Sequence, residues 1–133
     1  KPSGIGVKTV DHKIKTILIV DDNRLPRIIE RAILSEHFPE LSVLEAATGE
    51  EALETARKQP VDLALVDINV PGMDGLELGE WLRKESLVTH ICFVSANIQN
   101  TSREKAAQLN AQFIAKPMTE EKLITLIEGI GVA

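Results

Sequence analysis

Five short apolar runs recur along this chain, and stretches with helical spacing separate each run from the next. The runs cover residues 16–20, 42–46, 63–66, 91–95 and 112–115. Apolar runs of this length between polar residues indicate buried strands. Strands that alternate with helices are typical of βαβ units and of a parallel sheet. The sequence therefore predicts an α/β fold in which helices cover both faces of a five-stranded parallel sheet.

Capping residues mark where four of the helices begin. Asn23, Thr48, Asp74 and Thr119 each precede a helical stretch, and their side chains suit the first-turn amides of a helix. Apolar residues then recur at helical spacing. They are Leu25, Ile28, Ile29, Ala32 and Ile33, then Ala52, Leu53 and Ala56, then Leu78 and Leu82, and finally Leu123, Ile124, Ile127 and Ile130. The remaining helix, within roughly 98–109, has a poor apolar stripe, so we expect it to be weakly anchored and mobile.

The composition limits the classes of function. A chain of 133 residues fits one domain, which we expect over 14–131 after a flexible lead or linker at 1–13. The formal charge of −5 argues against direct nucleic-acid binding, and no apolar run is long enough for a membrane span. The single Cys92 lies within an apolar run, which suits a reducing compartment and hence the cytoplasm. The start at Lys1 rather than Met favours a piece excised from a longer protein.

Polar side chains follow the predicted strands. Asp21 and Asp22 come after the first, Asp67 ends the third, Ser95 ends the fourth, and Lys116 follows the fifth. In parallel α/β sheets ligands bind outside the carboxyl ends of the strands, so these side chains should share one crevice. Clustered carboxylates suit Mg²⁺, which also binds through substrate phosphate. The hydroxyl and the ammonium are left to hold an anionic oxygen, which points to a phosphoryl group.

With these residues placed, residues 14–131 resemble the CheY-like receiver domains of two-component response regulators. The matching segments are Ile17-Leu18-Ile19-Val20-Asp21-Asp22, Asp67-Ile68-Asn69-Val70-Pro71-Gly72-Met73-Asp74-Gly75, Ser95-Ala96 and Lys116-Pro117. The resemblance implies a doubly wound, flavodoxin-like (βα)5 sandwich with strand order 2-1-3-4-5. It also implies a signalling module that is no enzyme beyond catalysing its own phosphorylation and dephosphorylation.

The resemblance also implies roles for individual residues. Asp67 accepts a phosphoryl group from a phosphohistidine of a histidine kinase or histidine phosphotransfer protein, with Mg²⁺ as cofactor. The metal ligands are Asp22 directly, Asp21 directly or through water, Asp67, and the backbone carbonyl of Asn69. One phosphoryl oxygen pairs with Lys116. Another is bound by the Ser95 hydroxyl and the Ala96 amide, and the bond before Pro117 is expected to be cis.

The resemblance further implies a switch that couples Ser95 to Phe113. Phosphate draws the hydroxyl inward and the aromatic ring rotates, which changes the face made by the helix near 98–109, the strand at 112–115 and the last helix. That face controls a partner or an attached output domain. Phe113 replaces the commoner Tyr and removes a hydroxyl, and Asn110 suits a left-handed backbone where Gly is frequent. Asn97 either affects how water reaches the phosphoryl group or caps a helix.

Several alternatives stay open within and beyond this interpretation. A free-standing receiver docks on a target, an attached one controls its own output domain, and a receiver of a hybrid kinase relays phosphate or acts as a sink. A phosphorylation-dependent homodimer is compatible with each. An aspartyl-phosphate hydrolase of the haloacid dehalogenase type would need an Asp where Asn69 stands. A flavodoxin-like electron carrier would need a Ser/Thr/Gly-rich loop after the first strand, which the sequence lacks.

Overall fold

The computed structural model describes residues 13–96 and 100–133, so most of the expected lead, together with Asn97, lies outside the described residues. Strands and helices alternate along the described chain. The elements are β1 (Thr16–Val20), α2 (Arg24–His37), β2 (Ser42–Ala46), α3 (Gly49–Lys58), β3 (Val61–Asp67), α4 (Gly75–Lys84), β4 (Val88–Ser95), α5 (Asn100–Gln108), β5 (Gln112–Ala115) and α6 (Glu120–Ile130). All predicted strands are present, and β3 and β4 extend beyond the apolar runs that indicated them.

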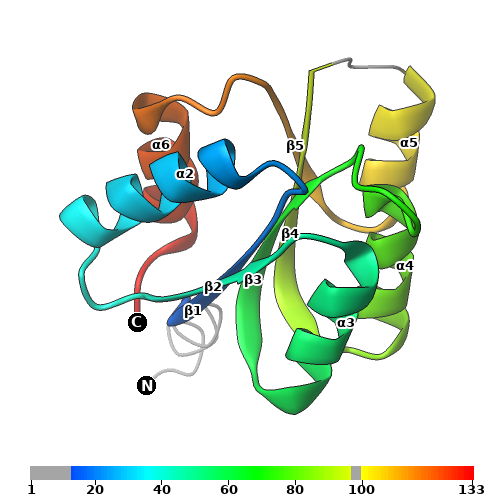
Figure 1. The fold of residues 1–133 in the computed structure, drawn as a ribbon, viewed down its shortest axis with the longest axis horizontal. Coiled ribbons are helices and arrows are strands. Elements are labelled where there is room, and N and C mark those ends of the chain that lie inside the picture. The colour runs from blue at the N-terminus through cyan, green and yellow to red at the C-terminus, as the bar shows by residue number, and fades with distance from the viewer. Residues whose placement is uncertain (1–12, 97–99) are drawn as a thin grey trace, which may run out of the picture.

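The five strands form one parallel sheet with the order β2-β1-β3-β4-β5. Helices α2 and α6 lie on one face, and α3, α4 and α5 lie on the other (Figure 1). The predicted doubly wound fold and strand order are therefore confirmed. Because every strand runs the same way, all five carboxyl ends meet at one edge of the sheet, where such folds bind ligands.

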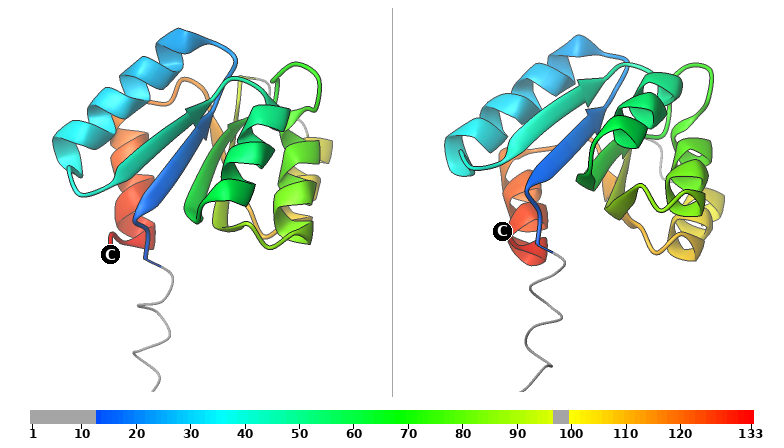
Figure 2. Two further views of the ribbon diagram at one scale, coloured as in Figure 1. Left: turned by 60° about the horizontal axis from the view of Figure 1, so that its bottom comes forward. Right: turned by 90° about the horizontal axis from the view of Figure 1, so that it is seen from below.

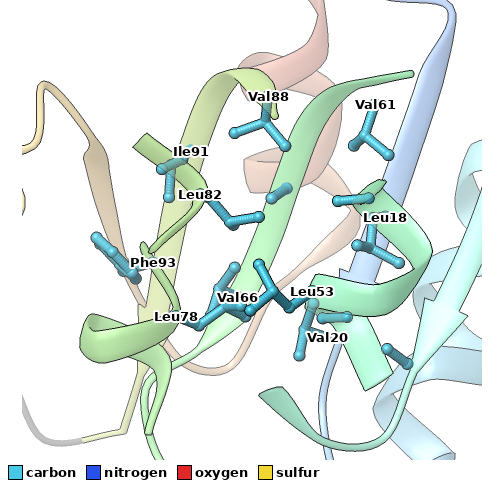
Figure 3. Close-up of a cluster of buried hydrophobic side chains, with 14 of the residues drawn as sticks. Leu18, Val20, Leu53, Val61, Val66, Leu78, Leu82, Val88, Ile91 and Phe93 are labelled. Atoms are coloured by element: carbon cyan, nitrogen blue, oxygen red, sulfur yellow. The ribbon is translucent and has the colours of Figure 1, made fainter. Parts of the chain in front are cut away.

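The sheet separates two hydrophobic cores. Leu18 and Val20 of β1 point into the core beneath α3 and α4, which Figure 3 shows together with Leu78, Leu82 and Phe93. The intervening β1 residues, Ile17 and Ile19, point into the core beneath α2 and α6. A parallel strand covered on both faces needs apolar residues at every position, which explains why the β1 run shows no alternation with polar residues.

Side-chain caps begin the four helices at the predicted residues. Oδ1 of Asn23 accepts from the Leu25 amide at 3.2 Å, and Oδ1 of Asp74 accepts from the Glu77 amide at 2.9 Å. The hydroxyls of Thr48 and Thr119 make the equivalent bonds to Glu51 and Lys122. These bonds satisfy first-turn amides that have no partner within the helix.

Helix α2 does not bury the apolar stripe that indicated it in the sequence. Leu25, Ile28 and Ile29 are 60%, 48% and 46% exposed, whereas the buried residues of the helix are Glu30 and Leu34. Two residues four apart share a helix face, and this face is the one that rests on the sheet. The apolar stripe that indicated the helix is therefore a surface feature over its first turns.

Helix α5 has little contact with the core. Among its described side chains, from Ser102 to Gln108, only Ala106 is buried. This agrees with the poor apolar stripe of the sequence, while mobility of the helix stays a prediction. Asn110 after the helix has φ 55°, the left-handed backbone expected there.

The last described residues return to the start of the sheet. Ile14 forms a parallel bridge with Val132, and the Ala133 amide donates to the Ile14 carbonyl at 2.9 Å. Both views in Figure 2 show the end of the chain beside the segment that leads into β1. Across residues 13–96 and 100–133, no helix combines the length and the apolar character that crossing a membrane requires.

Candidate functional site

Asp21 and Asp22 follow β1 at the carboxyl edge of the sheet. Asp21 is buried, its amide donates to the Ala46 carbonyl at 3.1 Å, and its Oδ1 accepts from the Asn23 amide at 2.9 Å. Asp22 is exposed. The turn therefore buries one carboxylate and leaves the other exposed at the surface.

A guanidinium anchors this turn from helix α2. Arg27 donates to the backbone carbonyl of Asp21 through Nη1 and to Oε1 of Glu45 through Nε at 3.0 Å. Oε2 of Glu45 also accepts from Arg31 at 2.6 Å, and these bonds lower the pKa of Glu45. Helix α2 and strand β2 are thereby tied to the turn that presents the first two Asp residues.

Asp67 ends β3 and is also buried. Its Oδ1 accepts from the Asn69 amide at 3.0 Å. The loop then folds back so closely that a Cβ on Gly75 would lie 2.5 Å from the Asp67 carbonyl oxygen. Only glycine fits at that distance, so Gly75 allows helix α4 to begin directly against the Asp67 backbone.

Lys116 reaches the two buried carboxylates from the end of β5. Its Nζ lies 3.0 Å from Oδ2 of Asp67 and 3.3 Å from Oδ2 of Asp21. Partial burial acts to lower the pKa of Lys116, but the hydrogen bond to Asp67 and the field of Asp21 outweigh it, and the pKa is raised. Burial raises the pKa of Asp21, against the lowering effects of the Asn23 amide and Lys116. The peptide bond between Lys116 and Pro117 is cis, as expected.

The three carboxylates form a group that fits a hard cation. Ligand oxygens of Asp21, Asp22 and Asp67 all lie within 4.8 Å of one another. Carboxylate oxygens at such spacing suit Mg²⁺, which commonly uses one or two carboxylates together with water and phosphate. The backbone of Asn69 lies beside them through its bond to Asp67. The donor set is therefore compatible with the expected ion.

Ser95 ends β4, the strand beside β3, and Ala96 follows it, while Phe113 lies on β5, the next strand beyond β4. Ser95 is buried at the end of β4 and its carbonyl accepts from the Lys116 amide at 2.9 Å, while Ala96 is exposed. Phe113 pairs in register with Phe93, two residues before Ser95. Side chains two apart on a strand share a face, so Ser95 and Phe113 lie on the same side of the sheet. The structure thus places Ser95 at the edge where Asp67 ends β3, and Phe113 two register positions before that edge on β5.

Two residues near the site were missed by sequence reasoning. One is Arg27, which no motif marks. The other is Glu30, which is 5% exposed and lines a pocket of about 380 Å³ together with Ile29, Lys116 and Met118. Burial, followed by the field of Asp21, raises the pKa of Glu30 to about 7. Glu30 lies four residues before Leu34 and therefore on the same helix face, which is the sequence feature that could have indicated its burial. The apolar stripe of α2 indicated a different face.

Comparison with known proteins identifies the fold and its family. The family model described as the response regulator receiver domain matches residues 17–128. The response regulator GtcR of Aneurinibacillus migulanus is 35% identical over 116 residues, which cover 86% of this chain and 47% of that protein. The polar-differentiation response regulator DivK of Brucella ovis is 31% identical over 118 residues, which cover 86% of this chain and 94% of DivK.

A solved structure agrees with these relatives. The CheY-like response regulator receiver domain protein from Methanospirillum hungatei superposes with a TM-score of 0.80 at 30% identity, covering 88% of this chain and 93% of that one. The chain spans about half the length of GtcR and nearly all of DivK. Receiver domains are signalling modules that work with histidine kinases and output domains. From the matched family model, the sequence identities and the shared fold, it follows that this chain belongs to the receiver domains of two-component response regulators.

Proposed function

We propose that Asp67 is the phosphoacceptor of this receiver and takes its phosphoryl group from a phosphohistidine of a partner protein. The observation that carries the proposal is the pairing of Asp67 with Lys116 inside a group of three carboxylates. An Asp and a Lys that merely stabilised the fold would not need two further carboxylates beside them. A nucleophile, a cation site and an ammonium for the transferred oxygens are what phosphoryl transfer requires.

In the transfer step a carboxylate oxygen of Asp67 attacks phosphorus in line. The new O–P bond forms as the P–N bond of the phosphohistidine breaks, and the electron pair of that bond stays with the imidazole nitrogen. Lys116 then pairs with one phosphoryl oxygen, while the Ser95 hydroxyl and the Ala96 amide bind another. Catalysis consists of positioning and charge neutralisation, which the fixed strand ends supply. The domain in this proposal promotes only its own phosphorylation and dephosphorylation.

Asp21, Asp22, Asp67 and the carbonyl of Asn69 would hold Mg²⁺. The ion, when bound, neutralises the negative charge that gathers as the phosphoryl group meets the carboxylates. Arg27 supports this role from outside, because its bond to the Asp21 carbonyl keeps the turn in place. A buried reduced cysteine, Cys92, suits the cytoplasmic location that we include in the proposal.

The output is proposed to pass through Ser95 and Phe113 to the surface of α5, β5 and α6. Both residues lie on the same side of the sheet, and Phe113 is only partly buried. Its ring lies 5.9 Å from the Arg103 guanidinium of α5, so a rotation of the ring would disturb that helix. Helix α5 has few core contacts to resist a shift, which supports its part in the switch.

The phosphodonor is proposed to dock on the exposed apolar part of α2. Leu25, Ile28 and Ile29 are exposed there, and Ile29 lines the pocket that Lys116 also lines. A protein that delivers a phosphoryl group to Asp67 must come close to Lys116, and so to this part of α2. Exposed apolar residues next to a reaction site are typical of an interaction surface.

The relatives include proteins of two sizes, so the output could be a docked target or an attached domain. The chain covers 47% of GtcR but 94% of DivK. A receiver that acts as a sink or relay would lose its phosphoryl group to a second partner. Comparing the phosphoryl half-life with and without candidate phosphotransfer proteins separates that role from a signal. A hydrolase of the dehalogenase type is disfavoured because Asn69 stands where its second Asp would be.

The deciding experiment replaces the acceptor while keeping its shape. Wild-type protein incubated with acetyl phosphate and Mg²⁺ should gain the mass of one phosphoryl group, removable by hydroxylamine, and Asp67→Asn should gain none. The control is Asp62→Asn, near the opposite end of the same strand, whose carboxylate accepts from the amides of Lys15 and Thr16. It should label normally. Labelling of Asp67→Asn at the wild-type level would refute the site.

A further inference from the structure

Glu30 is a buried carboxylate for which the described residues provide no hydrogen-bond donor or ion-pair partner. Its side chain is 5% exposed, and it lines the same pocket as Lys116. Taking an ionised carboxylate out of water is costly unless a proton or a cation neutralises it. The ordinary occupant of such a position on the core face of a helix is an apolar side chain. The phosphorylation steps described above give no role to this buried carboxylate.

Both side-chain oxygens of Asp67 are occupied in the structure. Oδ1 accepts from the backbone amide of Asn69, and Oδ2 accepts from Lys116 Nζ at 3.0 Å. A carboxylate oxygen that accepts from a charged donor is a weaker nucleophile, because the donor draws on its electron density. The Asn69 amide belongs to the backbone of the loop, whereas the Lys116 ammonium is carried on a flexible stem. Lys116 is therefore the group that can move away and leave Oδ2 of Asp67 a stronger nucleophile.

Asp21 is held in the same way. Its Oδ1 accepts from the Asn23 amide and its Oδ2 accepts from Lys116 at 3.3 Å. When Oδ2 of both carboxylates is needed for a cation or a phosphoryl group, the ammonium loses both partners together. Glu30 is a carboxylate outside this pair that lines a pocket together with Lys116.

We propose that Glu30 is a positioning residue that receives the Lys116 ammonium while Asp67 is released for attack. The Lys116 ammonium thus has two positions, one in contact with Asp67 and Asp21 and one facing Glu30. After the phosphoryl group has been transferred to Asp67, the ammonium moves back and pairs with a phosphoryl oxygen. This rests on the proposed role of Asp67 as phosphoacceptor. The charged groups that act on Glu30 are Asp21 after β1, Asp67 at the end of β3 and Lys116 after β5.

The electrostatics of the pocket are consistent with this role. Burial and the field of Asp21 raise the pKa of Glu30, and the field of Lys116 lowers it. Glu30 and Lys116 therefore already act on each other across the pocket. The competing explanation is that a proton alone neutralises Glu30 and that Lys116 turns to solvent when it leaves Asp67. The two explanations differ in whether Lys116 acts on Glu30 more strongly or less strongly after it leaves.

The first test follows the Glu30 carboxyl carbon by NMR through a pH titration. Wild type and Lys116→Met are compared, each without and with saturating Mg²⁺. The ion should bind Asp21 and Asp67 and so displace the Lys116 ammonium although no phosphoryl group is present. The proposal expects the lowering of the Glu30 pKa by Lys116 to become larger when Mg²⁺ is added. An unchanged or smaller effect of Lys116 would overturn it.

The second test is a double-mutant cycle on the rate of labelling by acetyl phosphate. Glu30→Gln should slow labelling by at least about twofold when Lys116 is present and should have no effect in Lys116→Met. Glu50→Gln is the matched control, because it removes one charge from an exposed residue that lies against Gly72 in the loop after Asp67. Its effect should be equal in both backgrounds. Equal slowing by Glu30→Gln in both backgrounds would show a general field effect and contradict the proposal.

The two tests keep the failures apart. If wild-type Asp67 is not labelled, the proposed function fails, while the NMR comparison still decides whether Lys116 moves towards Glu30. If Glu30→Gln does not fold, wild type and Lys116→Met still provide the complete NMR comparison. If labelling occurs and the cycle shows no coupling, Glu30 has no role through Lys116 and the proposed function stands.

Discussion

Lys116 Nζ lies 3.0 Å from Oδ2 of Asp67, although β5 and β3, which carry the two residues, are not neighbours in the sheet. The side chain crosses the end of β4 to make this contact and also reaches Asp21. In the structure the ammonium takes the place beside the carboxylates that a cation would share. One side chain therefore occupies the carboxylate oxygens that a cation would need, and removing that side chain should change the affinity for the cation.

Replacing Lys116 by Met should strengthen Mg²⁺ binding. The substitution keeps an apolar stem and removes the positive charge that competes for Asp21 and Asp67. A unit charge about 4 Å away is worth ~1 kcal/mol when water screens the pair fully, which corresponds to about a fivefold lower Kd as the least expected effect. Calorimetric titration with Mg²⁺ measures it. Weaker or unchanged binding would show that Lys116 does not compete with the ion. The same variant, once labelled, should show little phosphate-dependent change in the amide shifts around Phe113.

Replacing Arg27 by Gln should weaken Mg²⁺ binding while the fold is retained. The Asp21 carbonyl loses its guanidinium donor and Glu45 loses one partner, so the turn that carries Asp21 is less well held. Losing a hydrogen bond from a charged donor costs about 1.5–3 kcal/mol. Arg57→Gln, which removes an exposed ion pair with Glu85, is the control and should bind Mg²⁺ as wild type does. Binding of Mg²⁺ by Arg27→Gln at the wild-type affinity would show that Arg27 does not support the metal site.

Stability in chelator should fall between about pH 4.5 and pH 7 because of Glu30. Its pKa is raised from 4.5 to about 7, so the folded protein keeps a proton that the unfolded chain releases in this range. Since the folded state then binds more protons, the free energy of unfolding declines as pH rises, by up to ~3 kcal/mol for this shift. Urea unfolding of wild type and Glu30→Gln across pH measures the difference. Parallel pH profiles of the two proteins would contradict the raised pKa.

Charged substitutions on the exposed part of α2 should impair transfer from a protein donor but not from a small molecule. Leu25→Asp and Ile28→Asp place charge where the phosphodonor is proposed to dock. Because both side chains are largely exposed, their stability should change by less than about 0.5 kcal/mol. Trp81→Asp, an exposed apolar residue on α4, is the control. Phosphotransfer from autophosphorylated histidine kinases is compared with acetyl phosphate labelling, and unimpaired transfer would exclude this surface.

Two glycines in helices should respond to alanine with opposite signs. A Cβ on Gly79 of α4 would lie 2.5 Å from Cζ of Phe93, so Gly79→Ala should force the buried ring to shift and cost about 1–3 kcal/mol. A Cβ on Gly129 of α6 meets nothing within 4 Å, so Gly129→Ala should stabilise by about 0.5–1 kcal/mol. Thermal unfolding compares both. An unchanged free energy of unfolding in Gly79→Ala would mean that α4 can move away from β4 at no cost.

Features that depend on local pattern were accessible from the sequence. The β1 run is apolar at every position because both faces of the sheet are covered, and that pattern marked it as a buried strand. Asn23 and Asp74 marked helix starts because their side chains bond to amides two or three residues away. The short range of these interactions explains why the elements and their caps were predicted correctly.

Helix α2 shows where local pattern fails. Its apolar residues have helical spacing, yet Leu25 and Ile28 are exposed and Glu30 is buried. Spacing identifies a helix, but the buried face is chosen by how the helix lies on the sheet and on α6. A surface that another protein covers produces the same apolar spacing as a core face. The apolar spacing of α2 therefore did not single out the pocket at Glu30 or the anchor at Arg27.

The alternation of apolar runs and helical stretches is enough to establish the parallel α/β fold and the end of the sheet at which Asp21, Asp67 and Lys116 gather, because parallel strands bring their carboxyl ends together. Which of these side chains touch depends on the packing of the elements in three dimensions. Lys116 reaches Asp67 across an intervening strand, and Glu30 enters the same pocket from a helix. Such contacts depend on distances between elements far apart in the chain, which no local periodicity encodes.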